Sequence, residues 1–193
     1  MAAKRPTAPP LCIVEPGDGI LIELAYATSN NFFGSPLYRR PLCLLRPVAA
    51  LSLQLAASSL WAQGYLLCVR DAFRPALAQS MLWAAATDKS FVASPRLGST
   101  HTRGIAVDVD LRSLDGTLLD MGSSFDEMSP ASAHGATGIA PLAAARRAVL
   151  AKAMERAGFE RLPHEWWHYQ LPQAAKYSLI ADAELGALNP MDP

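Results

Sequence analysis

The sequence predicts an α+β protein. Helical and strand patterns are mixed along the chain without the regular βαβ alternation that a doubly wound parallel sheet requires. The length of 193 residues fits one domain, and 51% hydrophobic against 18% charged residues is enough apolar surface for a sizeable core. We therefore expect a single domain over residues 1–193, with a poorly structured segment at 1–10.

The first third of the chain predicts two strands, a loop and a helix. Short apolar runs at 11–14 and 20–24 are separated by the Pro-Gly-Asp-Gly turn at 16–19, which favours two strands. Polar and turn-forming residues at 27–41 predict a long ordered loop. Apolar residues at helical spacing predict a helix over 47–63, which a glycine ends.

The remaining elements follow from the same signals. The apolar run 65–69 predicts a buried strand. A proline opens the helix expected over 75–87, because proline suits the first helical position. Clean alternation predicts a strand at 104–111, and an Ala-, Arg- and Leu-rich stretch followed by glycine predicts a helix at 141–157. Bracketing prolines leave room only for a final strand at 167–171.

The alternating strand carries the first candidate site. Asp108 and Asp110 share one face of it, and His101 precedes the glycine turn that leads into it. Such a loop can bring an imidazole and a carboxylate together, which supplies two of the three protein ligands that a catalytic zinc ion requires. The alternative is an amphipathic strand whose aspartates face water.

The second candidate site is His164-Glu165-Trp166-Trp167-His168. Read literally it is the HExxH motif, in which a helix presents two histidines to zinc and the glutamate acts as general base. Prolines lie close on both sides, which is unfavourable for a long helix. The favoured interpretation therefore uses only Glu165 and His168, with His164 incidental.

The charge balance argues against a nucleic-acid partner. Lys and Arg number 17, as do Asp and Glu, and the largest basic cluster, Arg146, Arg147 and Lys152, is expected on a solvated helix face. No uninterrupted apolar run reaches the roughly 18 residues of a membrane span. We expect neither nucleic acid nor a membrane as a partner.

Targeting and cysteine signals predict a cytoplasmic protein. The first residues carry prolines where a secretory signal needs an apolar stretch of roughly 7–15 residues. Three scattered cysteines fit reduced thiols and offer no CxxC zinc site: Cys12, Cys43 and Cys68. Any zinc ion must therefore be held by histidines and carboxylates.

Five motifs in a fixed order carry a resemblance to a known family. They are YATSNNFFG at 26–34, DAFRP at 71–75, SxHxxGxAxD at 99–108, MGSSFD at 121–126 and EWWHY at 165–169. Together they span nearly the whole domain and resemble the zinc D-Ala-D-Ala peptidases, most closely the D-alanyl-D-alanine dipeptidases. The resemblance implies their hedgehog-like fold, with a central, largely antiparallel sheet flanked by helices.

The resemblance also implies roles for individual residues. Zinc, one ion per chain, would be held by His101, Asp108 and His168, with Glu165 as general base. Such a metal lowers the pKa of bound water towards about 7. Arg74 would stabilise the oxyanion that forms at the scissile carbonyl; outside this context, a surface ion pair with its neighbouring aspartate would be the simpler interpretation.

Substrate selection is assigned in the same way. Asp126 and Tyr26 would bind the ammonium group of a free dipeptide, with Ser99 near the substrate. Phe73 departs from the family pattern, which usually has tyrosine there. The expected function is hydrolysis of D-Ala-D-Ala, a small-molecule partner. The alternatives are a D,D-carboxypeptidase acting on peptidoglycan stem peptides, an HExxH protease and a zinc-binding module without activity. A homodimer is possible.

Overall fold

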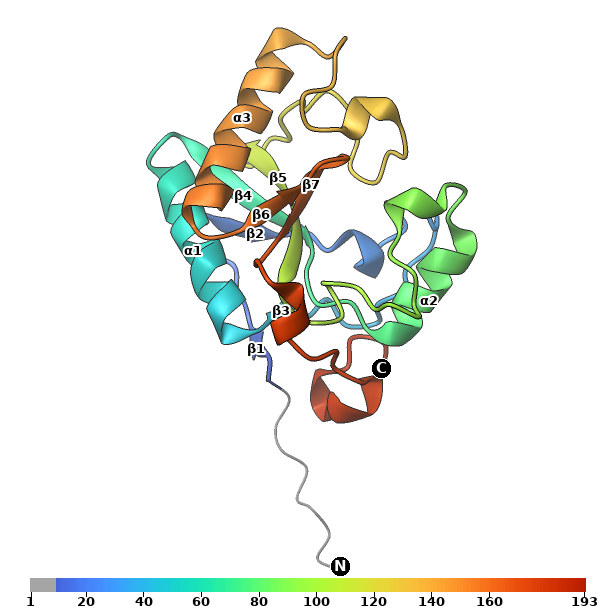
Figure 1. Cartoon of the computed structure of the whole chain (residues 1–193). Helices are drawn as coiled ribbons and strands as arrows, with labels where there is room; N and C mark the ends of the chain where they lie inside the picture. The colour runs from blue at the N-terminus through green and yellow to red at the C-terminus, as the bar shows by residue number, and fades with distance from the viewer. Residues whose placement is uncertain (1–9) are drawn as a thin grey trace, which may run out of the picture.

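A five-stranded sheet forms the centre of the protein, in a computed structural model that describes residues 10–193 (Figure 1). The strand order is β2-β4-β5-β7-β6, with β2 parallel to β4 and every other neighbour antiparallel. The predicted α+β class is therefore confirmed. The five strands are β2 (Ile20–Ile22), β4 (Tyr65–Asp71), β5 (Ala106–Ser113), β6 (Glu160–Leu162) and β7 (Glu165–Gln170).

Two helices pack on one face of this sheet, while α2 and several loops lie on the opposite side (Figure 1). The helices are α1 (Pro47–Trp61), α2 (Ala76–Ala85) and α3 (Pro141–Arg156). A separate antiparallel pair consists of β1 (Cys12–Ile13) and β3 (Leu44–Leu45). Six short 3-10 helices complete the described chain: η1 (Ala25–Ala27), η2 (Lys89–Phe91), η3 (Pro130–Ser132), η4 (Ala174–Lys176), η5 (Asp182–Glu184) and η6 (Gly186–Leu188).

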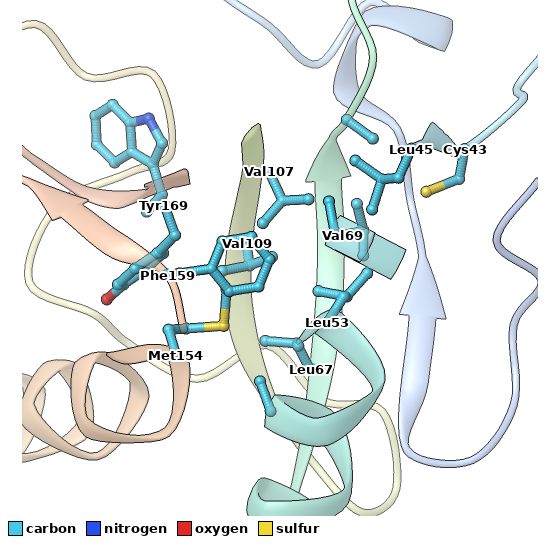
Figure 2. Packing of buried hydrophobic residues seen from close by; sticks show 14 of the residues in the cluster. Cys43, Leu45, Leu53, Leu67, Val69, Val107, Val109, Met154, Phe159 and Tyr169 are labelled. Carbon is cyan, nitrogen blue, oxygen red and sulfur yellow. The ribbon is translucent and has the colours of Figure 1, made fainter. Parts of the chain in front are cut away.

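The core lies between the sheet and the pair α1 and α3. Val107 and Val109 of β5 point towards these helices, where Leu53 and Met154 meet them (Figure 2). All four side chains are fully buried, and each contributes about 1.5–3 kcal/mol relative to exposure. Because strand residues alternate between faces, this packing turns Asp108 and Asp110 to the opposite face of the sheet.

Three neighbouring strands bring polar residues into one row on that face. The register pairs Asp71 of β4 with Asp108 of β5, and Asp108 with His168 of β7. A register shift between Val69 and Asp71 inserts one extra residue into β4, as a β-bulge does. The side chains of the consecutive residues Arg70 and Asp71 can therefore both lie on the polar face of the sheet.

Most predicted elements are confirmed with small shifts of their ends. The helix predicted over 75–87 begins after Pro75, which is its N-cap, and ends at Ala85. The last strand begins at Glu165, two residues before its predicted start. The short strands β3 (Leu44–Leu45) and β6 (Glu160–Leu162) were not predicted. The poorly structured segment expected at 1–10 lies, except for residue 10, outside the described residues.

One expectation for α3 is wrong. Arg147 is buried, and it donates hydrogen bonds to the carbonyl oxygens of Met121, Ala131 and Ala133. Its guanidinium also lies over the Trp166 ring, 5.3 Å from the centroid. The arginine that counted towards a solvated basic face therefore anchors the loop that precedes α3.

Among residues 10–193, no helix combines the length and the apolar character of a bilayer-spanning segment. The three cysteines are unpaired thiols, with Cys43 and Cys68 buried and Cys12 partly exposed. The structure therefore agrees with the prediction of reduced thiols.

Candidate active site

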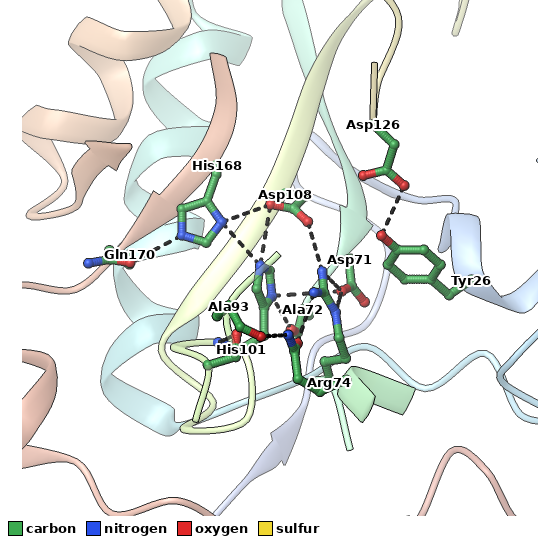
Figure 3. Close-up of polar contacts among 12 residues, drawn as sticks. Tyr26, Asp71, Ala72, Arg74, Ala93, His101, Asp108, Asp126, His168 and Gln170 are labelled. Carbon is green, nitrogen blue, oxygen red and sulfur yellow. Dashed lines mark hydrogen bonds and ion pairs between the residues drawn. The ribbon is translucent and has the colours of Figure 1, made fainter. Parts of the chain in front are cut away.

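Three potential metal ligands converge at the row where β5 meets β7. Nε2 of His101 lies 3.1 Å from Nδ1 of His168, and these two atoms lie 3.3 and 3.1 Å from Oδ1 of Asp108 (Figure 3). All three residues are buried. His101 comes from the turn before β5, whereas Asp108 and His168 are cross-strand neighbours. The alternative that the aspartates of β5 face water is therefore wrong.

Hydrogen bonds on the far side of each imidazole fix which nitrogen points inward. Nδ1 of His101 lies 2.6 Å from the carbonyl oxygen of Ala72, which can only accept, so this nitrogen carries the proton. Nε2 of His168 lies 3.1 Å from Oε1 of Gln170 and donates in the same way. When both imidazoles are neutral, two nitrogen lone pairs and a carboxylate then face one another, an arrangement that a proton or a metal cation between them stabilises.

The charges of the group agree with this requirement. Burial alone would raise the pKa of Asp108, but the two histidines hold it well below its usual value. Burial would lower the pKa of His168, yet its bond to Asp108 raises it. The pocket therefore favours positive charge beside Asp108. A donor set of two imidazoles and one carboxylate fits a metal ion, and these residues would leave a coordination position for water.

Arg74 is held rigidly beside this group. Its Nε and Nη2 each lie 2.8 Å from Oδ2 of Asp71, and its Nη1 donates to Oε1 of Gln79 at 3.0 Å. Nη2 is also 3.4 Å from Oδ2 of Asp108. The hydroxyl of Tyr38 donates to Asp71 as well. The pair of Arg74 with Asp71 is thus buried and is not the surface ion pair considered as an alternative.

Glu165 lies at the start of β7 and lines the same cavity. Burial raises its pKa from 4.5 to about 7, and the nearby His168 lowers it. A carboxyl group with this pKa can accept and return a proton near neutral pH. The preceding His164 is exposed in a turn, so the pentad is not helical and cannot present both histidines as HExxH proteases do.

A second carboxyl group faces the cavity from the loop before α3. Asp126 accepts a hydrogen bond of 2.9 Å from the hydroxyl of Tyr26 (Figure 3). Burial raises the pKa of Asp126 well above its usual value, and the charge of Asp108 adds to this effect. A cationic ligand would relieve that cost. Ser99 is buried nearby, and its hydroxyl accepts the backbone NH of His101, which supports the histidine turn.

One cavity of about 200 Å³ is bordered by the three potential metal ligands and by Arg74, Glu165 and Asp126. Apolar side chains form part of its wall: Phe32, Phe91, Val92, Met128, Leu162 and Trp167. Every site residue expected from the sequence lines this cavity: Tyr26, Arg74, Ser99, His101, Asp108, Asp126, Glu165 and His168.

Two supporting residues were not predicted: Gln79, which helps to hold Arg74, and Gln170, which holds His168. The ion pair of Asp71 with Arg74 was considered only as a surface contact, whereas the structure buries it beside the cavity. Nothing in the sequence distinguishes Gln79 or Gln170 from solvent-exposed glutamines.

A three-ligand metal site beside a carboxyl group of raised pKa is typical of metal-dependent hydrolases. Comparisons with known proteins narrow this class. A family profile described as D-ala-D-ala dipeptidase matches residues 8–184, and the chain belongs to that peptidase family. A D-alanyl-D-alanine dipeptidase of Escherichia coli (strain K12) is 42% identical over 161 residues, 83% of each chain.

Two further relatives carry the same description. D-alanyl-D-alanine dipeptidases of Enterococcus faecalis (strain ATCC 700802 / V583) and Enterococcus faecium are 36% and 37% identical. Each match covers 79% of this chain and 86% of the relative. The resemblance noted from five sequence motifs is therefore confirmed.

Proposed function

We propose that this protein is a zinc-dependent dipeptidase that hydrolyses free D-Ala-D-Ala to two molecules of D-alanine. The convergence of His101, Asp108 and His168 beside Glu165, in a cavity that also contains the Tyr26–Asp126 pair, carries the proposal. The names of the relatives support the choice of substrate.

The metal site would supply the electrophile. His101, Asp108 and His168 would hold the zinc ion, which when bound acidifies a water molecule and polarises the peptide carbonyl. Glu165 takes the proton of the attacking water and later gives it to the leaving amine, a task that suits a pKa of about 7.

Arg74 would stabilise the negative charge that develops on the carbonyl oxygen. Asp71 and Gln79 fix its guanidinium, so that little reorganisation is needed when this charge appears. Its position over the Tyr26 ring, 5.1 Å from the centroid, directs it to the same cavity.

Asp126 would select a free dipeptide by pairing with its ammonium group. Its raised pKa without a cationic partner supports this role, because an ammonium ion would stabilise the charged carboxylate. A peptidoglycan stem peptide has an uncharged amide at that place. Binding it would leave the carboxyl group without its charged partner, at a cost of about 1–3 kcal/mol.

Release of D-alanine by purified protein tests the substrate. We expect zinc-dependent cleavage of D-Ala-D-Ala, lost with a chelator and restored by zinc, and much slower cleavage of N-acetyl-D-Ala-D-Ala. Equal cleavage of both would indicate a D,D-carboxypeptidase and remove the role of Asp126. Cleavage of neither by zinc-loaded protein would contradict the proposed substrate.

Two substitutions test the assignment of the general base. Glu165→Gln should lower kcat about 10²–10⁴-fold while metal content is unchanged, because it removes only the proton acceptor. His164→Ala, in the adjacent exposed turn, is the matched control and should keep both metal and turnover. Loss of metal in His164→Ala would favour the HExxH alternative, and full activity of Glu165→Gln would exclude Glu165 as the base.

A further inference from the structure

A second cluster of charged side chains lies on the same face of the sheet, next to the loop that carries Asp126. Oε2 of Glu23 accepts from Nη1 of Arg70 at 2.9 Å and from Nη2 of Arg112 at 2.6 Å. Arg112 also donates to Asp110 at 2.9 Å, and Nε of Arg70 is 3.8 Å from that carboxylate. The side chain of Arg70 is only 9% exposed, so these ion pairs hold its guanidinium in one position.

The guanidinium of Arg70 lies over an aromatic ring of the Asp126 loop. Its Cζ is 5.6 Å from the centroid of Phe125, within the range of a cation–π contact. Phe125 also meets Trp167 and Tyr26 edge to face, with centroids 5.6 and 6.5 Å apart. Phe125 is therefore held by residues from β4, β7 and η1.

The residue that follows Phe125 has a backbone conformation that needs such support. Asp126 has φ of 61°, in the left-handed region that non-glycine residues rarely adopt. A conformation of this kind persists only where the surroundings hold it in place. The side chain of Asp126 is held by the hydrogen bond from Tyr26, and its backbone follows directly from Phe125.

We propose that Arg70 is a positioning residue for substrate selection: it fixes Phe125 and thereby keeps Asp126 turned towards the cavity. The inference rests on the proposed role of Asp126 as the partner of the substrate ammonium group. Arg112 belongs to the same ion-pair cluster, but its guanidinium lies over no aromatic ring of residues 10–193. This difference between two neighbouring arginines provides a matched control.

The experiment measures selectivity for the ammonium group. The readout is kcat/KM for D-Ala-D-Ala divided by kcat/KM for N-propionyl-D-alanine, the same molecule without the ammonium group. We expect Asp126→Asn to lower this ratio about 100-fold and Arg70→Met about tenfold. Phe125→Leu should act like Arg70→Met, and Arg112→Met should change the ratio less than about twofold. Metal content and circular dichroism report whether each variant is intact.

The outcomes separate the inference from the proposed function. If Asp126→Asn lowers the ratio but Arg70→Met and Phe125→Leu do not, the positioning role is wrong. An effect of Arg112→Met as large as that of Arg70→Met also overturns it, because the ion-pair cluster and not the ring contact would then be responsible. An unchanged ratio in Asp126→Asn contradicts the proposed role of Asp126 itself. Should Arg70→Met not fold, Phe125→Leu leaves the ion pairs intact and decides alone.

Discussion

Asp108 and Asp110 stand two residues apart on β5, both buried and both on the polar face of the sheet, yet their surroundings differ in kind. Asp110 is paired with two arginines that bring permanent charges: Nε of Arg112 lies 2.9 Å and Nε of Arg70 lies 3.8 Å from its carboxylate. Asp108 lies beside the imidazoles of His101 and His168, where positive charge requires a proton or a metal ion. Nη2 of Arg74 lies 3.4 Å from its other carboxylate oxygen. One carboxylate is part of a closed ion-pair cluster, and the other is available to a cation.

The pKa values follow this difference. Burial raises the pKa of Asp110, and Arg112 only partly opposes that effect. Burial also acts to raise the pKa of Asp108, but the histidines more than compensate and lower it. The same residue type on the same strand face thus has its pKa raised or lowered according to what the neighbouring strands place opposite it.

Replacing each aspartate by asparagine is the strongest way to break the comparison. Asp108→Asn should lower metal affinity and kcat/KM about 10³-fold or more, because it removes a charged ligand. Asp110→Asn should keep metal and activity but lower the free energy of unfolding by about 1–3 kcal/mol, since Arg112 loses one of its two carboxylate partners and keeps only Glu23. Metal analysis, D-alanine release and denaturant unfolding check both. Loss of metal in Asp110→Asn with retention in Asp108→Asn would reverse the assignment.

The pH dependence of stability extends the comparison to a third buried carboxyl group, that of Glu165. The pKa of Glu165 is about 7 in the folded protein, whereas its usual value, taken for the unfolded chain, is 4.5. Between these two pH values the folded state therefore binds more protons than the unfolded state. The contribution of Glu165 to the free energy of unfolding must therefore fall as the pH rises through this window. In protein stripped of metal, the loss between roughly pH 5 and pH 8 should be about 2 kcal/mol.

Glu165→Gln is the control for this measurement, because an amide does not titrate. The difference in unfolding free energy between the two metal-free proteins should grow in favour of Glu165→Gln as the pH rises. A constant difference would show that Glu165 titrates normally and would weaken its assignment as a base near neutral pH.

The smallest expected effect concerns the partner of His168. Gln170→Leu removes the acceptor that fixes the imidazole, and metal affinity should fall about tenfold. Competition with a chelator of known affinity measures this directly. Gln54→Leu, on the exposed face of α1, is the matched control and should leave affinity unchanged. Equal affinity in Gln170→Leu and wild type would show that the orientation of His168 does not depend on Gln170.

Local signals in the sequence were sufficient for the main elements and for naming candidate site residues that lie together. Helical spacing predicted the first helix, an opening proline the second and an Ala-rich composition ended by glycine the third, while alternation predicted strand β5. All eight residues that the family motifs singled out line the cavity, including Tyr26 and Asp126, which are 100 positions apart. Single domain organisation, the cytoplasmic location and the possible homodimer stay predictions.

The sequence by itself therefore determined the α+β class, the family and the set of candidate site residues that meet in one cavity, since these depend on residue types and their local order. Only the tertiary structure decided which of them are buried and what they touch. The register across β4, β5 and β7 aligns Asp71, Asp108 and His168, and the same sheet gives Asp110 its arginine partners. Burial, hydrogen-bond partners and pKa are properties of such long-range contacts, which no local pattern of residues contains.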